Sequence, residues 1–260
     1  MSGVLNLFCL PFAGGSGAVF HPWHALAPQS VRVTPLALPG RGAHWNEALV
    51  AAWTPLLDRL YAQVEPHAWQ PYALFGHSMG ALLAFELAHR LCERGMPAPA
   101  LLILSASRPP RDAHRLSGTD WRHCPDEAVL DTLFGIGGAD AAWANHELRE
   151  LMLPVVRNDF QLCADYRYRE RALLATPIHV LAGRDDTGCP FAPAFAAWRD
   201  ESAALTTGRE LAGGHLFLRD DPAATFAAVM DALDACRTPS VQGVAASDGG
   251  APDHADAIST

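Results

Sequence analysis

The sequence contains no long hydrophobic run and carries little charge. No stretch of its 260 residues is long and apolar enough to span a bilayer, and the short apolar run near the start stops at Pro11 with no basic segment before it. We therefore expect no membrane association and no targeting segment. A cytoplasmic protein is the resulting prediction.

Cysteine is scarce as well, and its spacing argues against a fold held together by disulfides or by a zinc site. The six cysteines are scattered and never form a CxxC pair, so reduced thiols explain them better than disulfides or a zinc site. A formal charge of −9 at pH 7 argues against nucleic acid as a partner, because phosphate binding needs a basic surface. Neither a GxxxxGK(S/T) nor a GxGxxG pattern is present, so a phosphate-cradling loop is not expected.

Apolar runs alternate with helix-like stretches along a chain that suits one large domain. Half of the residues are hydrophobic and 18% are charged, which allows one sizeable core. The alternation predicts an α/β fold, with a mostly parallel sheet covered by helices on both faces and functional loops at the carboxyl ends of the strands. The predicted strands are Val4–Leu10, Val31–Leu36, Tyr72–Phe75, Leu101–Leu104, Ile178–Ala182 and, weakly, Arg209–Leu211.

Several helix ends are marked by their residue types. Thr54 before Pro55 is typical of an N-cap followed by proline in the first turn. A second helix is predicted over Ala81–Arg94, because apolar residues recur at helical spacing until Gly95 stops them. A last helix is expected to start at Asp221-Pro222.

The most informative pentapeptide is Gly76-His77-Ser78-Met79-Gly80, which follows a predicted strand and opens a predicted helix. Gly-x-Ser-x-Gly at such a junction is typical of a nucleophile elbow, where the glycines permit a tight turn and the serine stands at a helix N-terminus. An ordinary Gly/Ser turn is the alternative, since five residues can match by chance. The elbow predicts Ser78 as a nucleophile.

A serine needs a base and an acid, expected later in the chain in the order Ser, acid, His. The predicted strand Ile178–Ala182 ends in Gly183-Arg184-Asp185-Asp186, and Gly213-Gly214 precede His215. We predict His215 as the base and take the other eleven histidines as surface or core residues. Asp186 is favoured as the acid because it lies three residues after the glycine, with Asp185 as the alternative.

A serine hydrolase also needs two N–H groups that bind the oxyanion. One comes from the residue after the nucleophile and the other from the loop after the first strand. That loop is Pro11-Phe12-Ala13-Gly14-Gly15-Ser16-Gly17. The predicted donors are therefore the backbone N–H groups of Met79 and Ala13.

One connection, between Leu104 and Ile178, is much longer than a crossover helix requires. Helical patterns at Asp126–Phe134 and His146–Tyr168 predict a helical lid over Ser78, with Pro154 breaking or kinking the second helix. Leu151 and Val155 would line an acyl pocket and the lid would move. The alternative is a helical hairpin packed away from the site.

These patterns divide the chain into four segments. We predict a hydrolase core in residues 1–106 and 176–237, with the lid as an insertion at 107–175. Residues 238–260 are mostly small or polar, which predicts a disordered tail.

Five motifs in order carry a resemblance to a known family. They are Leu10–Ser16, Leu38–Gly42, Gly76–Gly80, Leu151–Phe160 and Gly213–Leu218. Together they resemble the type II thioesterases that accompany polyketide synthases and nonribosomal peptide synthetases, over roughly residues 4 to 235. After Arg41-Gly42 this chain departs from the usual pattern, and Asn158 replaces an alanine of an Arg-Ala-Asp stretch.

The resemblance implies an α/β-hydrolase that removes acyl groups from the phosphopantetheine arm of carrier proteins, with Ser78, Asp186 and His215 as its catalytic residues. It would edit stalled or mis-primed synthases, without a metal or cofactor because a thioester is already activated. A free-standing esterase or product-releasing thioesterase is one alternative, and a non-catalytic binding protein on a hydrolase scaffold is another. We expect a monomer.

A carrier protein's docking surface is acidic by the same resemblance, and this chain is itself acidic. A productive encounter would then need a local basic patch. Arginines at the two ends of the insertion could form it, or could be ordinary solvated side chains. They are Arg108, Arg111, Arg115, Arg167, Arg169 and Arg171.

Overall fold

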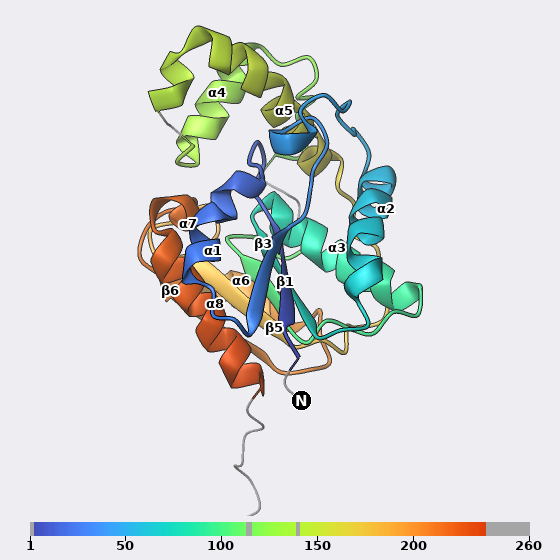
Figure 1. The fold of residues 1–260 in the computed structure, drawn as a ribbon. Helices are drawn as coiled ribbons and strands as arrows, with labels where there is room; N and C mark the ends of the chain where they lie inside the picture. Colours follow the sequence, from blue (N-terminus) through green and yellow to red (C-terminus); the bar gives the residue numbers. More distant parts are fainter. Residues whose placement is uncertain (1–2, 113–115, 139–140, 238–260) are drawn as a thin grey trace, which may run out of the picture.

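Six parallel strands form the central sheet of the computed structural model, in the order β2-β1-β3-β4-β5-β6 (Figure 1). The structure describes residues 3–112, 116–138 and 141–237, so the predicted tail and Arg115 lie outside the described residues. The strands are β1 (Leu5–Leu10), β2 (Val31–Pro35), β3 (Tyr72–His77), β4 (Leu102–Ser105), β5 (Ile178–Gly183) and β6 (Thr206–Leu211).

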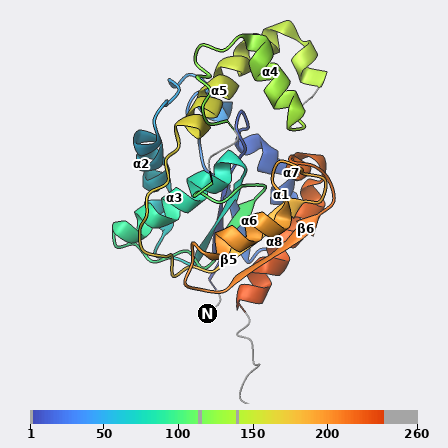
Figure 2. The same ribbon diagram turned by 180° about the vertical axis from the view of Figure 1, so that it is seen from behind.

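Helices cover both faces of the sheet (Figures 1 and 2). Alternate residues of β1 belong to two separate cores, with Leu5 and Leu7 on one side and Phe8 and Leu10 on the other. Helices α1 (His21–Leu26) and α8 (Pro222–Arg237) pack on the first side, and α2 (Trp53–Val64), α3 (Met79–Glu93) and α6 (Phe191–Arg199) on the second. Burial on both faces explains why the inner strands are continuous apolar runs.

Most predicted elements are present, with changed ends. Helix α8 begins at Pro222 as predicted, and the Asp221 side chain accepts a hydrogen bond from Ala224 N–H. The predicted N-cap at Thr54 is wrong, because α2 begins one residue earlier at Trp53 and Ala52 is its cap. The shorter elements are η1 (Gly17–Phe20), η2 (Gly42–His44), η3 (Glu65–His67), η4 (Ala141–Ala144) and α7 (Phe217–Asp220).

The long connection between β4 and β5 contains α4 (Asp126–Gly135), η4 and α5 (His146–Asp165), which we call the helical lobe. The lobe stands at the carboxyl edge of the sheet (Figure 1). Of the predicted break or kink at Pro154, the break is wrong, since α5 continues through this residue. Val155, Val156 and Phe160 beyond the proline are buried, so packing holds this turn despite the lost backbone hydrogen bond.

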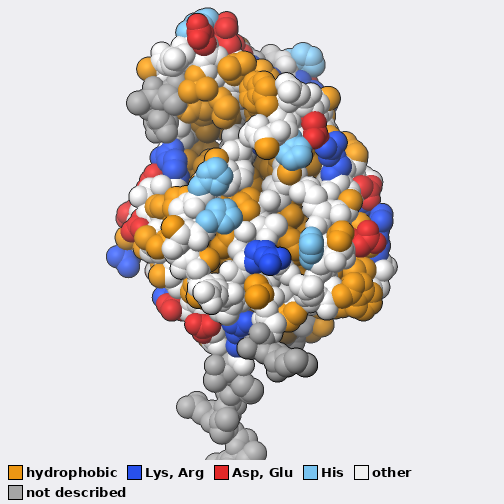
Figure 3. Space-filling model, viewed as in Figure 1, with side chains coloured by type: hydrophobic (Ala, Val, Ile, Leu, Met, Phe, Trp, Pro, Cys, Tyr) orange, Lys and Arg blue, Asp and Glu red, His pale blue; other side chains and the backbone are white. Residues whose placement is uncertain are grey.

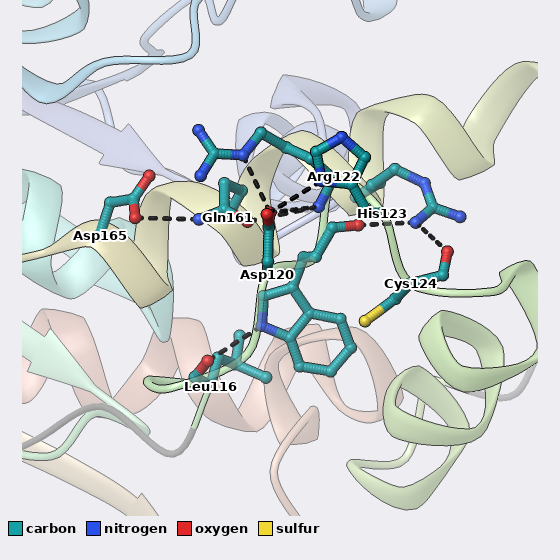
Figure 4. A network of polar contacts seen from close by, with 9 residues as sticks. Leu116, Asp120, Arg122, His123, Cys124, Gln161 and Asp165 are labelled. Atoms are coloured by element: carbon teal, nitrogen blue, oxygen red, sulfur yellow. Dashed lines mark hydrogen bonds and ion pairs between the residues drawn. The ribbon is translucent and has the colours of Figure 1, made fainter.

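A polar network fixes the loop before α4 to α5 (Figure 4). Arg157 of α5 donates to the carbonyl oxygens of Trp121 and Cys124, 2.6 Å away in each case, and pairs with Asp126. Gln161, one turn further along, accepts from Arg122 N–H at 3.3 Å. The loop, α4 and α5 are therefore joined as one unit.

Strand β1 starts, and α8 ends, at the edge of the sheet opposite the lobe (Figure 1). Among the described residues, no helix combines the length and hydropathy that crossing a membrane requires.

Candidate active site

Ser78 lies between β3 and α3 in a backbone conformation that serine rarely adopts, with φ 56° and ψ −116°. The flanking glycines explain how the turn fits. A Cβ on Gly76 would lie 2.0 Å from Gly80 O, and one on Gly80 would lie 2.3 Å from Leu10 O. Only glycine can occupy either position, so the turn is the tight elbow that the sequence predicts.

His215 lies in the loop after β6, directly against Ser78. Its Nε2 is 2.8 Å from Ser78 Oγ, and its side chain is almost fully buried. Two glycines allow this loop to approach Ser78. Gly213 has φ +103°, and a Cβ on Gly183 would lie 2.4 Å from Gly214 O. Of the glycine pair before the histidine, Gly213 therefore has the role that the sequence suggests, whereas a Cβ on Gly214 would meet no neighbour.

Asp186, rather than Asp185, completes the array. Asp186 Oδ2 is 2.6 Å from His215 Nδ1, and its Oδ1 accepts from the N–H groups of Gly188 and Cys189 at 3.0 and 3.1 Å. Asp186 is 5% exposed, whereas Asp185 is exposed. With the carboxylate accepting from Nδ1–H, Nε2 carries the lone pair and accepts from the Ser78 hydroxyl.

His77, inside the elbow motif, holds the loop that carries His215. It is fully buried, with Nε2 2.8 Å from His215 O and Nδ1 2.9 Å from Ser105 Oγ. Burial lowers the pKa of His77 to about 3, so the ring is neutral, donates from Nε2–H to the carbonyl and accepts the Ser105 hydroxyl at Nδ1. The sequence prediction took His77 as an ordinary surface or core residue and so missed its contact with His215 O. The position of His77 inside the elbow motif was the only signal for this contact.

The two predicted oxyanion donors come from adjacent backbone segments. The close approach of Gly80 to Leu10 O and Pro11 O places the loop after β1 beside the elbow. Met79 opens α3, so its N–H has no partner within the helix. Within the described residues, the N–H of Ala13 does not donate to a backbone carbonyl.

A small cavity lies beside Ser78 and His215. It measures about 20 Å³, room for one water molecule, so it is too small for an acyl chain. Neither α4 nor α5 contributes a described residue to this lining. A wider hollow separates the lobe from the core, with apolar side chains on the lobe side (Figure 3). The cavity's other lining residues are Ala106, Ser107, Arg108, Gly188 and Cys189.

Most of the arginines proposed as a basic patch are engaged within the protein. Arg111 pairs with buried Glu201 at 2.7 Å, and Arg171 pairs with buried Glu86 at 2.6 Å. Arg167 donates to two main-chain carbonyls. Arg108 lines the cavity and donates from Nε to Gly188 O at 2.8 Å. The pairings of Arg111 and Arg171 argue against a docking patch that uses them.

Comparison with known proteins places the chain in a family. The model of the thioesterase domain family matches residues 5–234. The chain belongs to this thioesterase family. The thioesterase PikA5 of Streptomyces venezuelae is 32% identical to it, over 84% of this chain and 77% of its own.

Solved structures agree with the family assignment. ClbQ, from the colibactin NRPS/PKS pathway, superposes on the thioesterase with a TM-score of 0.84 at 27% identity, covering 90% of this chain and 99% of its own. BorB, a type II thioesterase from the borrelidin biosynthetic cluster, gives 0.78 at 33% identity, with 88% and 93% covered. The predicted α/β-hydrolase fold and the likeness to type II thioesterases are confirmed.

Proposed function

We propose that this thioesterase hydrolyses acyl groups from the phosphopantetheine arms of carrier proteins, with Ser78 as nucleophile, His215 as base and Asp186 as the acid that orients it. The observation that supports the chemistry is the continuous hydrogen-bonded array from Ser78 Oγ through His215 to Asp186. The carrier-bound substrate and the editing role rest on the pathways named for ClbQ and BorB. We also propose that it works in the cytoplasm, where such synthases would operate.

In the acylation step, His215 Nε2 takes the Ser78 proton while Oγ attacks the thioester carbonyl carbon. The oxyanion that forms would accept from the N–H groups of Ala13 and Met79. When the carbon–sulfur bond breaks, His215 returns the proton to the pantetheine sulfur, and the free thiol leaves. The product of this step is an acyl-Ser78 ester.

In the deacylation step, a water molecule must reach the ester within range of His215. The cavity that Ser78 and His215 share has room for one. His215 takes a proton from this water while the water oxygen adds to the acyl carbon. The bond between the acyl carbon and Ser78 Oγ then breaks, and His215 returns the proton to Oγ. A carboxylic acid is released, and Ser78 is restored.

Steady-state rates on three substrates carrying the same acyl group test the proposal. We expect kcat/KM to be about 10-fold or more higher for the acyl-carrier protein than for the acyl-N-acetylcysteamine, because contacts remote from the thioester contribute binding energy. A p-nitrophenyl ester should be poorer still. Equal values for carrier-bound and small thioesters would contradict a carrier substrate, and absent labelling of Ser78 by a fluorophosphonate would contradict catalysis.

The helical lobe is proposed as the lid, with the acyl chain in the hollow beneath it. Leu151 of α5 is half exposed, so Leu151→Trp adds volume without overpacking the core, which Val155, only 2% exposed, would not allow. We expect the preferred acyl length to shift by about 10-fold to 200-fold in relative kcat/KM, the effect of one or two methylenes. Leu205→Trp, at an exposed residue before β6, is the control. An unchanged profile would make the lobe purely structural.

A further inference from the structure

The buried pair of Arg41 and Asp159 lies against the loop that supplies one proposed oxyanion donor. Asp159, on α5, is fully buried, and Arg41, between Gly40 and Gly42, is 6% exposed. Their pairing is bidentate: Arg41 donates to Oδ2 of Asp159 and, at 2.8 Å, to Oδ1. The carboxyl half of α5 passes beside the loops that follow β1 and β2 (Figure 1).

Asp159 has a third partner, the backbone of Gly14. Gly14 N–H donates to Asp159 Oδ2 at 2.7 Å, a short distance typical of a bond to a charged acceptor. Arg41 also makes a longer contact of 3.4 Å with Gly15 O. The pair therefore contacts the backbone next to Ala13, although Asp159 is 145 residues away from Gly14 in the chain.

The loop at this point is a β-turn whose geometry depends on Gly14. Gly15 N–H donates to Phe12 O at 2.9 Å, and Gly14 has φ +78°, as expected for the third residue of a type II turn. A Cβ on Gly14 would also lie 2.7 Å from Val156 Cγ2 of α5. The turn is thus pressed against the helix that carries Asp159.

These bonds fix both peptide planes that flank Ala13. The plane containing Phe12 O and Ala13 N is held by Gly15 N–H, and the plane containing Ala13 O and Gly14 N is held by Asp159. The direction of Ala13 N–H follows from the first plane, and the second prevents the central peptide of the turn from rotating. A donor useful in catalysis must keep such a fixed direction before the charge develops.

We infer that Asp159, held by Arg41, is a positioning residue for the oxyanion hole, acting through Gly14 on the Ala13 N–H. This inference rests on the proposed hydrolysis by Ser78. It assigns the carboxyl half of α5 to the fixed part of the site.

Two double variants separate the bond to Gly14 from the ion pair. Arg41→Met with Asp159→Asn removes both charges but leaves an amide oxygen that can accept from Gly14 N–H. Arg41→Met with Asp159→Leu removes the same charges and leaves no acceptor. Both avoid a lone buried charge, which would destabilise the fold whatever its role in catalysis.

We expect the leucine variant to have a kcat at least about 10-fold below that of the asparagine variant on an acyl-N-acetylcysteamine thioester, with similar KM. Affinity for a trifluoromethyl ketone analogue, which forms the oxyanion, should fall in parallel. Affinity for a thioether analogue, and the acid limb of the pH–rate profile, should not change, because His215 and Asp186 are untouched. Equal kcat in the two variants would overturn the inference.

A second measurement covers the case in which the leucine variant does not fold. In the ¹⁵N-labelled wild-type protein, the Gly14 amide should exchange with solvent far more slowly than an exposed loop amide, and the Arg41→Met, Asp159→Asn double variant, which keeps an acceptor, should retain slow exchange. Rapid exchange in the wild type would overturn the inference. These tests use a small thioester and a backbone amide, so they remain valid even if the substrate is not bound to a carrier protein. An unreactive Ser78 would contradict the proposed function and not this inference.

Discussion

Ser78→Ala and His215→Ala are each expected to lower kcat by on the order of 10³-fold or more while the fold persists. The reason is geometric: the proton must pass from Ser78 Oγ to His215 Nε2 across 2.8 Å. Asp186→Asn should cost somewhat less, because the amide can still contact Nδ1 but favours the wrong tautomer. Single-turnover and steady-state rates, with circular dichroism as a check on folding, measure these effects.

Asp185→Asn is the matched control for the acid. Asp185 is exposed and adjacent to Asp186 in the chain, so its replacement changes the same loop and the same net charge. We expect kcat close to that of the wild type. If Asp185→Asn were the crippling change and Asp186→Asn were not, the assignment of the acid would be wrong.

The second large effect concerns stability in acid. Burial lowers the pKa of three histidines below the usual 6.5, to about 3 for His77 and His89 and about 4 for His179. The unfolded chain binds protons below pH 6.5 that the folded chain does not, so the free energy of unfolding falls as pH falls. Each histidine adds to this fall in the free energy of unfolding until the pH reaches the pKa of that histidine in the folded protein.

The expected loss is about 1.4 kcal/mol per pH unit for each histidine, hence about 4 kcal/mol per unit for the three between roughly pH 5.5 and 4.5. Urea unfolding followed by tryptophan fluorescence from pH 7 to 4.5 measures it. His89→Leu should reduce the slope by about a third. A free energy of unfolding that is constant from pH 6.5 to 5 would contradict the prediction. The exposed carboxyl of Asp120, whose pKa is lowered to about 2, acts only below this range.

Local signals explain what the sequence could predict. The inner strands are apolar on both faces, so β1, β3, β4 and β5 stand out as short runs. Strand β6 was only weakly visible and proved longer, because it lies at the sheet edge with half-exposed polar residues. The three residues of the proposed triad could be predicted because each follows a strand and lies near glycines that the local turns require.

Contacts between distant segments left no such signal. The bonds from His77 to His215 and from Asp159 to Arg41 join residues 138 and 118 positions apart, and nothing in either local sequence indicates its partner. The predicted break at Pro154 was wrong for a related reason, since burial of the following turns outweighs the local cost of proline. A buried polar side chain acquires its role only when the fold supplies its neighbours.

The start of β1 and the end of α8 lie together at the edge of the sheet opposite Ser78 (Figure 1). A fusion partner, affinity tag or surface attachment joined directly to the start of β1 or to the end of α8 would therefore project away from the catalytic loops. The same arrangement suits immobilised reactors and tethered pairs of enzyme and carrier protein. In such a pair, the linker must be long enough to pass around the sheet before the carrier can present its thioester.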